Sequence, residues 1–238
     1  MSTTPKKRPR TQMREVTIEP FPTAAPGSVV ICQGQTRILC TASVSSPPPK
    51  WLPKNEEGQF VKGWVTAEYN MLPGSTPDRK RRGNDGRGTE IQRLIGRSLR
   101  AAVNLEKMPG IAITCDCDVL HADGGTRTAS ITGAYVALAQ AIGKLRAAGE
   151  IKRNPIIGPV SAISVGIIDG QAHLDLDYPL DVRAEVDMNV VMNHRGDYIE
   201  VQGTGEQGTF SKAQLDELLG LADKGAKKLV RLQRAALK

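Results

Sequence analysis

A glycine-rich turn, Asp123-Gly124-Gly125-Thr126-Arg127-Thr128, combines residue types that can hold a phosphate group. It separates a strand-like run, residues 111–119, from a helical pattern that begins near Thr128. Glycines let the backbone approach a ligand closely, and the first N–H groups of a helix attract anions. Arg127 adds a planar guanidinium that matches phosphate oxygens. The turn therefore predicts a phosphate site; a tight strand-to-helix turn with a surface arginine is the alternative.

A second arginine, Arg87, precedes another predicted helix. Thr89 and Gln92 have the spacing of a capping box, which predicts that this helix begins at Thr89. Two helix starts that each carry an arginine can converge on one small anion. A solvated arginine beside a flexible loop is the alternative.

Two carboxylates, Asp181 and Asp187, could hold a hydrated Mg²⁺ for chemistry on phosphate esters. Six residues of extended strand span about 20 Å, which is too far for one ion. The segment around Asp181 would therefore have to fold back, and Pro179 favours a turn there. Asp175 and Asp177 are rival carboxylates, and acidic residues on an exposed strand face are the alternative interpretation.

Clustered arginines suggest a surface for the backbone of a nucleic acid, because neutralising phosphates releases counterions. One group lies in a loop rich in glycine and proline, residues 74–88, and another shares a face of the helix that follows. A solvated run of charges is the alternative. The candidates for RNA binding are Arg79, Arg81, Arg82, Arg93 and Arg97.

Hydrophobic periodicity predicts the elements that must position these residues. Hairpins and helices follow one another without strict βαβ alternation, which favours an α+β fold of mixed sheets covered by helices. The predicted strands are a hairpin around Gln33–Thr36 and the runs 62–71, 161–168, 172–176, 184–192 and 198–201. The predicted helices begin at Thr89, near Thr128 and after Ser211.

The composition is that of an ordinary soluble protein of 238 residues with a formal charge of +7, which favours a polyanionic partner. Aromatic residues make up only 4%, so base stacking is not expected to dominate nucleic-acid binding. The four cysteines lack zinc-site spacing and are expected to be buried, reduced thiols of a cytoplasmic protein. No apolar run approaches the ~20 residues that span a bilayer, and neither a P-loop nor a Gly-x-Ser-x-Gly elbow occurs.

Long stretches of the chain resemble the ribonuclease PH family of phosphate-dependent exoribonucleases. The similarity runs from about Gly27 to the C-terminus. The matching stretches are Gly63–Tyr69, Glu90–Arg100, Asp116–Val119, Ala122–Gly133, Glu185–Val191 and Glu200–Thr204.

The resemblance implies a single α+β domain, residues 15–238, after a basic N-terminal arm, residues 1–14. It implies a ring-shaped homo-hexamer that trims the 3′ end of transfer-RNA precursors with inorganic phosphate and releases nucleoside 5′-diphosphates. Ribosomal RNA is a further candidate substrate. By position, Arg87, Gly125, Thr126 and Arg127 match the family's phosphate site. Asp181 and Asp187 match its acidic pair, credited with holding Mg²⁺ or with acid–base catalysis.

The chain departs from the family pattern at three places. The N-terminal segment lacks the usual Arg-x-Asp-Gly-Arg, Gly74 replaces a common arginine before a shorter basic loop, and Val182-Arg183 replaces small residues. These changes bear on RNA grip and assembly more than on the phosphate site. Two other functions stay open, a non-catalytic RNA-binding ring subunit and a hydrolytic exonuclease.

Overall fold

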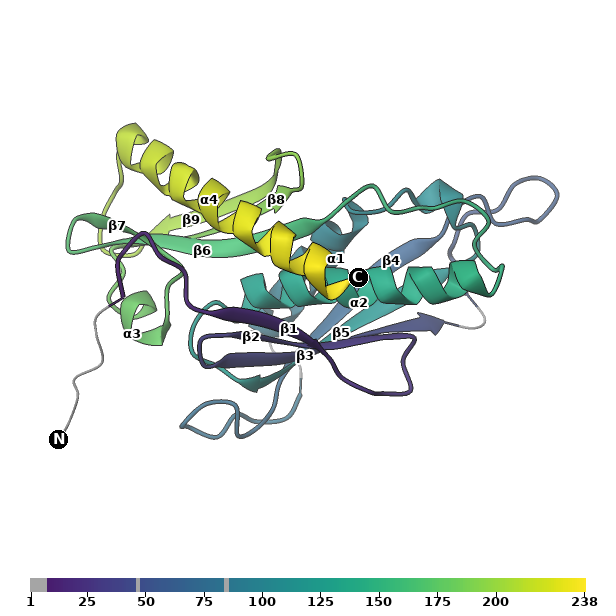
Figure 1. Ribbon diagram of the computed structural model, residues 1–238, viewed down its shortest axis with the longest axis horizontal. Helices are drawn as coiled ribbons and strands as arrows, with labels where there is room; N and C mark the ends of the chain where they lie inside the picture. Colours follow the sequence, from purple (N-terminus) through teal and green to yellow (C-terminus); the bar gives the residue numbers. More distant parts are fainter. Residues whose placement is uncertain (1–7, 46–47, 84–85) are drawn as a thin grey trace.

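The computed structural model describes residues 8–45, 48–83 and 86–238. They form two β-sheets and four α-helices in successive layers (Figure 1). Helix α2 (Thr126–Ala147) lies between the two sheets and contacts both, and α4 (Lys212–Ala236) covers the other face of the second sheet. The predicted α+β architecture of mixed sheets covered by helices is confirmed.

The elements follow the chain in mixed order. The first sheet has the spatial order β1 (Val16–Pro20), β2 (Gly27–Gln33), β3 (Thr36–Ser45), β5 (Ala112–His121) and β4 (Trp64–Met71). The second has the order β7 (Gln171–Leu174), β6 (Val160–Ile168), β8 (Val186–Asn193) and β9 (Tyr198–Gly205). The other helices are α1 (Gly86–Arg100), a 3₁₀ turn (Leu105–Lys107) and α3 (Tyr178–Asp181).

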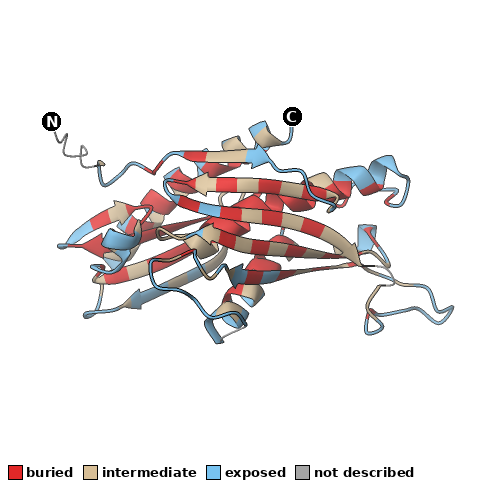
Figure 2. Cartoon of the chain, turned by 90° about the horizontal axis from the view of Figure 1, so that it is seen from below, coloured by how far each residue is buried: buried red, intermediate tan, exposed pale blue. Residues whose placement is uncertain are grey.

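The first sheet is antiparallel except where β4 pairs with β5 in parallel. Its β2–β3 hairpin turns at the predicted position. Buried and half-buried residues alternate along the strands (Figure 2), as expected when one face packs on the core and the other is partly open. The covered face packs against α2. The chain passes from the end of β5 through a short turn to the N-terminus of α2.

Helix α2 is buried on nearly every side because sheets lie on both sides of it. Its sequence from Ala129 to Ala139 is rich in small and aliphatic residues, which permits this close packing. At Gly133 a Cβ would lie 2.8 Å from the Cys40 Sγ atom, so the helix approaches β3 through a glycine. The start of α2 is thereby held firmly between the two sheets.

The second sheet is built around β6, whose nine residues are all buried. A hairpin at Asp169-Gly170 joins β6 to β7, which correspond to the predicted strands 161–168 and 172–176. Helix α4 begins after Ser211, as predicted, and Ser211 forms a capping box with Gln214 in which both reciprocal hydrogen bonds are present. None of the described helices is long and apolar enough to cross a membrane.

Two predicted boundaries were wrong. Helix α1 begins at Gly86, so Thr89 lies inside its first turn and is not its cap. The strand expected over 184–192 runs from Val186 to Asn193, and its polar face is not exposed. Asn189 is buried on that face, which is the side of the sheet covered by α2. The neighbouring strand β6 contacts α2 through the hydrogen bond from the backbone N–H of Ala162 to Thr132 Oγ1.

The N-terminal residues that the structure describes pack against the second sheet. The backbone N–H of Leu174 donates to the carbonyl of Arg10 at 2.8 Å. Met13 and Arg14 are buried. Arg8 donates to the carbonyl oxygens of Leu174 and Asp175. The division of the chain at residue 14 stays a prediction, and residues 1–7 of the arm lie outside the described residues.

Candidate active site

The glycine turn joins β5 to α2 in a backbone shape that glycine adopts readily. Gly124 and Gly125 have φ angles of 74° and 67°, in the left-handed region. A Cβ on Gly124 would lie 2.6 Å from the carbonyl oxygen of Leu176, so a side chain does not fit there. Gly125 is the N-cap of α2 and supplies no side-chain cap, and no acidic residue lies in the first turn. This helix start therefore suits an anionic ligand.

Arg14 supports the turn from within the protein. Its guanidinium donates hydrogen bonds to the carbonyl oxygens of Asp123 and, at 3.5 Å, Gly124. The same group donates to the carbonyl of Leu176 at 3.2 Å and pairs with Asp175, whose Oδ1 lies 2.6 Å from Nη2. Arg14 thereby links the glycine turn to the segment that leads into α3.

Tyr69 of β4 orients the first residue of α2. Its buried hydroxyl lies 2.8 Å from Thr126 Oγ1, within hydrogen-bond distance. Burial raises the pKa of the Tyr69 hydroxyl, whereas the hydrogen bond to Thr126 and the positive charges of Arg87 and Arg127 lower it. The hydroxyl keeps its proton at neutral pH because its ordinary pKa is already near 10. β4 of the first sheet thus fixes the hydroxyl at the start of α2.

Arg87 and Arg127 approach one region from the first turns of two helices. Arg87 is an exposed residue of α1, and Arg127 is half-buried in α2. Burial raises the pKa of the Asp181 carboxyl, and the positive charges of both arginines lower it in part. The positive charges of both arginines also lower the pKa of the Asp187 carboxyl in part. The structure therefore places two cationic groups, a helix start and two carboxylates within electrostatic reach of one another, and their roles in binding an anion stay predictions.

Asp181 and Asp187 come from different elements that fold back on each other. Asp181 ends α3, whose N-cap Asp177 accepts a hydrogen bond from the Leu180 backbone at 3.1 Å. Asp187 is half-buried on β8, between β6 and β9. Burial raises the pKa of Asp187 to about 6, and the negative charge of Asp181 adds to the rise. Asp187 is therefore half-buried, and Asp181, although exposed, lies on a helical turn and not on a strand.

The residues present fit a magnesium ion in chemical terms. Mg²⁺ is usually bound by one or two carboxylates together with waters and substrate phosphates, because it keeps part of its hydration shell. Asp181 and Asp187 repel each other, as the raised pKa of Asp187 indicates, and a divalent cation would relieve that repulsion. Within the described ranges, no cluster of three or more His, Cys, Asp or Glu side chains could cage a metal.

The predicted RNA-binding arginines lie on α1 and on the loop before it. Arg79, Arg81 and Arg82 are exposed on the loop after β4. Arg93 and Arg97 line a groove of about 370 Å³ between β4 and α1. The Nε atom of Arg97 also lies 2.8 Å from Glu200 Oε2 on β9, so α1 is tied to the second sheet. Their RNA-binding roles stay predictions.

Sequence reasoning missed Arg14, Tyr69 and Glu206 as parts of the site. Glu206 follows β9, and its negative charge raises the pKa of both Asp181 and Asp187. No local spacing connects these residues with the glycine turn, because sheet pairing brings them there. One signal was available for Arg14, which lies between the apolar residues Met13 and Val16 at the start of a strand. An arginine in such a segment is buried only when it has a charged or polar partner, so a partner elsewhere in the chain could have been expected.

The chain matches two successive family models over most of its length. Residues 12–142 match "3′ exoribonuclease family, domain 1", and residues 158–225 match domain 2 of the same family. The ribonuclease PH of Corynebacterium efficiens is 54% identical, covering 97% of this chain and 94% of its own. The ribonuclease PH of Rhodopirellula baltica is 53% identical, covering 99% and 98%. The chain belongs to the ribonuclease PH family.

Solved structures of more distant relatives share the ribonuclease PH fold. An Archaeoglobus fulgidus exosome with RNA bound to the active site has a TM-score of 0.78 at 19% identity, covering 97% of this chain and 91% of that chain. An archaeal exosome core has a TM-score of 0.77 at 19% identity, covering 95% and 89%. The resemblance to the ribonuclease PH family that the sequence motifs indicated is confirmed.

Proposed function

We propose that this chain is a phosphorolytic 3′–5′ exoribonuclease. An oxygen of inorganic phosphate attacks the phosphorus of the last phosphodiester in an RNA. The bond from that phosphorus to the 3′ oxygen of the preceding nucleotide breaks, and this oxygen takes up a proton. A nucleoside 5′-diphosphate leaves and the RNA is one residue shorter. The reaction is reversible because one phosphoric bond is exchanged for another of similar energy.

The observation that supports this proposal best is the meeting of Arg87, Arg127, Asp181 and Asp187 at the start of α2. Phosphate and RNA are both anions, so cationic groups and N–H donors must offset their repulsion before they react. We assign Gly125, Thr126, Arg127 and Arg87 to the attacking phosphate. Arg14 and Tyr69 hold the turn in place through their hydrogen bonds.

Asp181 and Asp187 are the residues that would hold Mg²⁺, which supplies positive charge to the reacting oxygens when bound. Because the pKa of Asp187 is about 6, its protonated fraction near neutral pH is larger than that of an ordinary aspartate. Asp187 is therefore also suited to acid–base catalysis at the 3′ oxygen. Replacement by asparagine separates these roles, because an amide can still bind a metal weakly but cannot transfer a proton.

The exposed arginines supply a binding surface for RNA upstream of its 3′ end. We assign Arg79, Arg81, Arg82, Arg93 and Arg97 to this surface. Transfer-RNA precursors with 3′ extensions are the proposed substrate, because the full-length relatives are named ribonuclease PH. Ribosomal RNA precursors are a second candidate. We further propose a homo-hexamer built as a trimer of dimers, and a cytoplasmic location; a stable monomer on a sizing column would contradict the assembly.

One assay distinguishes the enzyme from its alternatives. RNA is incubated with Mg²⁺, with and without inorganic phosphate, and the released nucleotides are separated. We expect nucleoside diphosphates only when phosphate is present. Monophosphates released without phosphate would instead identify a hydrolytic exonuclease, and the absence of any release would identify a non-catalytic RNA-binding ring subunit.

A further inference from the structure

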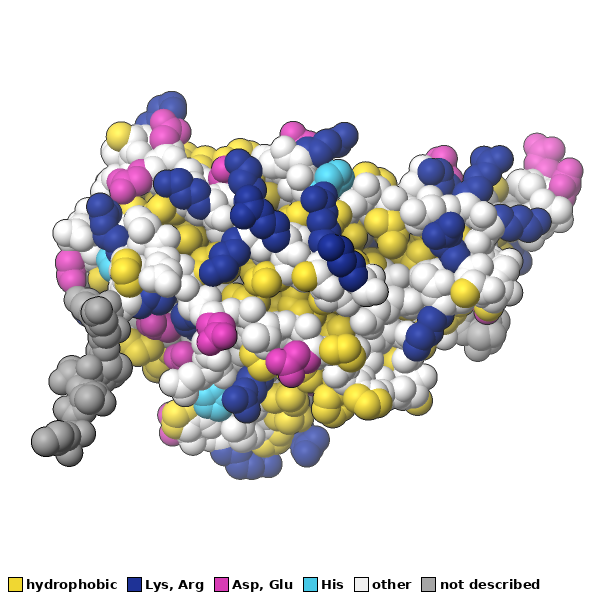
Figure 3. Space-filling view, in the orientation of Figure 1, with side chains coloured by type: hydrophobic (Ala, Val, Ile, Leu, Met, Phe, Trp, Pro, Cys, Tyr) yellow, Lys and Arg dark blue, Asp and Glu magenta, His cyan; other side chains and the backbone are white. Residues whose placement is uncertain are grey.

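A basic groove lies where α4 passes the turn between β8 and β9, apart from the candidate active site. We call it the α4 groove; its volume is about 170 Å³. Lysine and arginine side chains form a row over α4 in the space-filling view (Figure 3). The basic residues that line the groove are Lys227, Arg231 and Arg234 of α4 and His194 and Arg195 of the turn. The three α4 residues are spaced i, i+4 and i+7, so they form one stripe on the helix.

Much of this positive charge has no carboxylate partner. Lys227 pairs with Asp223 on the same helix, with Nζ 2.6 Å from Oδ2, and Arg195 Nε lies 3.3 Å from Asp197. Arg231 and Arg234 form no ion pair with any carboxylate in the part of the chain that the structure describes. Both are exposed, so their guanidinium groups are available to an external anion.

The shape of the groove is set by tight packing of the β8–β9 turn. The His194 ring packs directly on the loop that precedes β6, because a Cβ at Gly158 would lie 2.2 Å from its Nδ1 atom. The side-chain oxygen of Asn193 accepts hydrogen bonds from the backbone N–H groups of Arg195 and Asp197 at 2.8 and 3.0 Å. The groove is thus preformed, and little ordering is needed before a ligand binds.

The groove and the active site lie at opposite ends and on opposite faces of the second sheet. Asp187 is near the start of β8 and faces α2, whereas Met192 is near its end and lines the groove under α4. Five residues of strand separate them by about 16 Å along the chain. The groove therefore does not reach the nucleotide at the 3′ end. A ligand in the groove is either a distant part of the same RNA substrate or a separate molecule.

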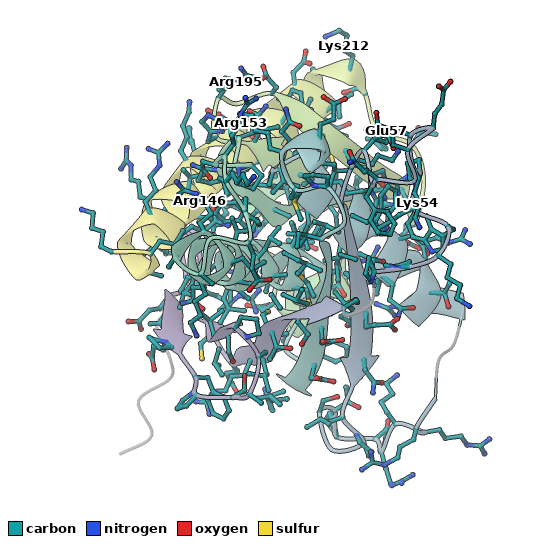
Figure 4. All side chains as sticks on the ribbon, turned by 90° about the vertical axis from the view of Figure 1, so that its right-hand side faces the viewer. Lys54, Glu57, Arg146, Arg153, Arg195 and Lys212 are labelled. Atoms are coloured by element: carbon teal, nitrogen blue, oxygen red, sulfur yellow. The ribbon has the colours of Figure 1, made fainter. Side chains whose placement is uncertain are left out.

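Further basic residues extend the same side of the molecule. Figure 4 shows Arg195, Arg153 and Arg146 on one side, with Lys54 and Glu57 on the other. Arg146 and Arg153 are exposed and come from the end of α2 and the loop after it. Repeated cations along one side match the repeated phosphates of a nucleic-acid backbone.

We propose that the α4 groove binds the phosphodiester backbone in the folded body of an RNA substrate whose 3′ end lies at the glycine turn. This inference rests on the proposed exoribonuclease function. Guanidinium groups match phosphate oxygens in a bidentate manner. The apolar floor of the groove, Met192, Ala226 and Val230, is buried, so it offers no exposed anchor of the kind that protein interfaces use. An RNA backbone therefore fits better than an acidic protein.

The test compares a folded and an unfolded RNA on the full-length protein. The substrates are a transfer RNA with a short 3′ extension and a single-stranded oligonucleotide with the same 3′ sequence. The triple variant Arg195→Gln, Arg231→Gln, Arg234→Gln is expected to bind the transfer RNA roughly ten-fold more weakly, since each exposed charge contact contributes about two-fold. Its KM for the transfer RNA rises likewise, while kcat and KM for the oligonucleotide stay unchanged.

A charge-matched control removes exposed lysines away from this stripe. Lys54→Gln, Lys107→Gln, Lys212→Gln removes three positive charges that do not line the groove, and it is expected to leave transfer-RNA binding within about two-fold of the wild type, as for exposed charges in general. Raising the salt concentration should weaken transfer-RNA binding less steeply in the groove variant than in the wild type, because fewer counterions are released.

Two results would overturn the proposal. One is unchanged transfer-RNA affinity in a groove variant that remains folded by circular dichroism, which would leave an acidic protein as the alternative occupant. The other is an equal loss of affinity in the control variant, which would indicate a general charge effect. Binding is measured by fluorescence anisotropy without phosphate, so a failure of phosphorolysis in the wild type would reject the proposed function without deciding the groove.

Discussion

The Nη2 atom of Arg14 lies 2.6 Å from Oδ1 of Asp175, and both side chains are buried beneath the glycine turn. Asp175 adopts a φ of 62°, which is uncommon for a residue other than glycine. It also accepts a hydrogen bond from Gln33 Nε2 at 2.6 Å. This pair is the physical connection between the N-terminal segment, the turn before α2 and the segment that carries Asp181.

Breaking this pair should destabilise the protein and loosen phosphate binding together. Asp175→Asn preserves shape and tolerates the left-handed backbone, but it removes the nearer negative charge from buried Arg14, whose remaining ion pair, with Asp123, is longer at 3.6 Å. We expect a loss of about 3–5 kcal/mol in the free energy of unfolding, measured by urea denaturation. Arg14→Lys, a milder change, should raise the KM for phosphate more than the KM for RNA. Arg10→Lys, on an exposed pair with Glu217, is the matched control and should change neither.

Removing Arg127 should abolish most of the chemistry and spare most RNA binding. Arg127→Ala is expected to lower phosphorolysis about 10²–10³-fold, the usual effect of losing one charge-stabilising donor. Arg146→Ala, an exposed arginine at the other end of α2, should leave the rate on a short oligonucleotide unchanged. Turnover and RNA affinity are measured separately, and near-normal turnover in Arg127→Ala would reject the phosphate assignment.

Tyr69→Phe tests whether the first sheet orients the start of α2. The variant removes one buried hydroxyl and leaves Thr126 Oγ1 without that partner. A hydrogen bond of this kind contributes about 1 kcal/mol, so we expect a KM for phosphate a few-fold higher with kcat little changed. A drop in kcat alone, with phosphate affinity intact, would mean that Tyr69 acts on the reaction and not on the helix start.

The raised pKa of Asp187 predicts a cost in stability. An aspartate in an unfolded chain titrates near 3.9, whereas Asp187 titrates at about 6 in the folded protein. Between these values the folded state binds more protons, so stability falls as pH rises. Asp187→Asn should therefore stabilise the metal-free protein at neutral pH by about 1–2 kcal/mol, allowing for partial solvent screening.

The advantage of that variant should shrink as the pH falls from about 6 towards 4 and should vanish below the unfolded-state pKa of about 3.9, where the wild-type carboxyl is protonated in both states. Thermal unfolding in the presence of a chelator at several pH values measures it, with Glu185→Gln, a nearby glutamate before β8, as the control. Equal stability of Asp187→Asn and the wild type at neutral pH would contradict the claim that burial and the charge of Asp181 destabilise the ionised Asp187 carboxyl. Activity of this variant should be lost, since the amide of asparagine cannot transfer a proton at the 3′ oxygen.

Local patterns were enough to predict the elements but not all of their assembly. The hairpin at Gly34, the capping box at Ser211 and the glycine turn follow from turn and cap chemistry within a few residues, and each is present. The start of α1 was misplaced because Thr89 has a cap's spacing inside a helix that begins earlier. Local spacing could not decide whether α1 begins at Gly86 or at Thr89.

The site itself was predictable only in part. From spacing alone, Asp181 and Asp187 seemed too far apart for one ion. The chain turns directly after α3, where the backbone N–H of Ala184 donates to the carbonyl of Asp181 at 3.2 Å, and this turn shortens the path between the two carboxylates. Arg14 and Tyr69 reach the glycine turn through strand pairing across the first sheet and packing on the second, so no sequence spacing reveals them. Motif resemblance supplied the phosphate site residues, whereas their supporting contacts required the fold.

The most direct test of the central claim is the fate of the oxygen atoms of inorganic phosphate. The protein is incubated with RNA, Mg²⁺ and phosphate labelled throughout with ¹⁸O, and the released nucleotides are analysed by mass spectrometry. If phosphate bound at Gly125–Arg127 is the nucleophile, each nucleoside diphosphate will carry every labelled oxygen of one phosphate, and Arg127→Ala will suppress that product. Unlabelled nucleoside monophosphates released at the same rate without phosphate would contradict the account.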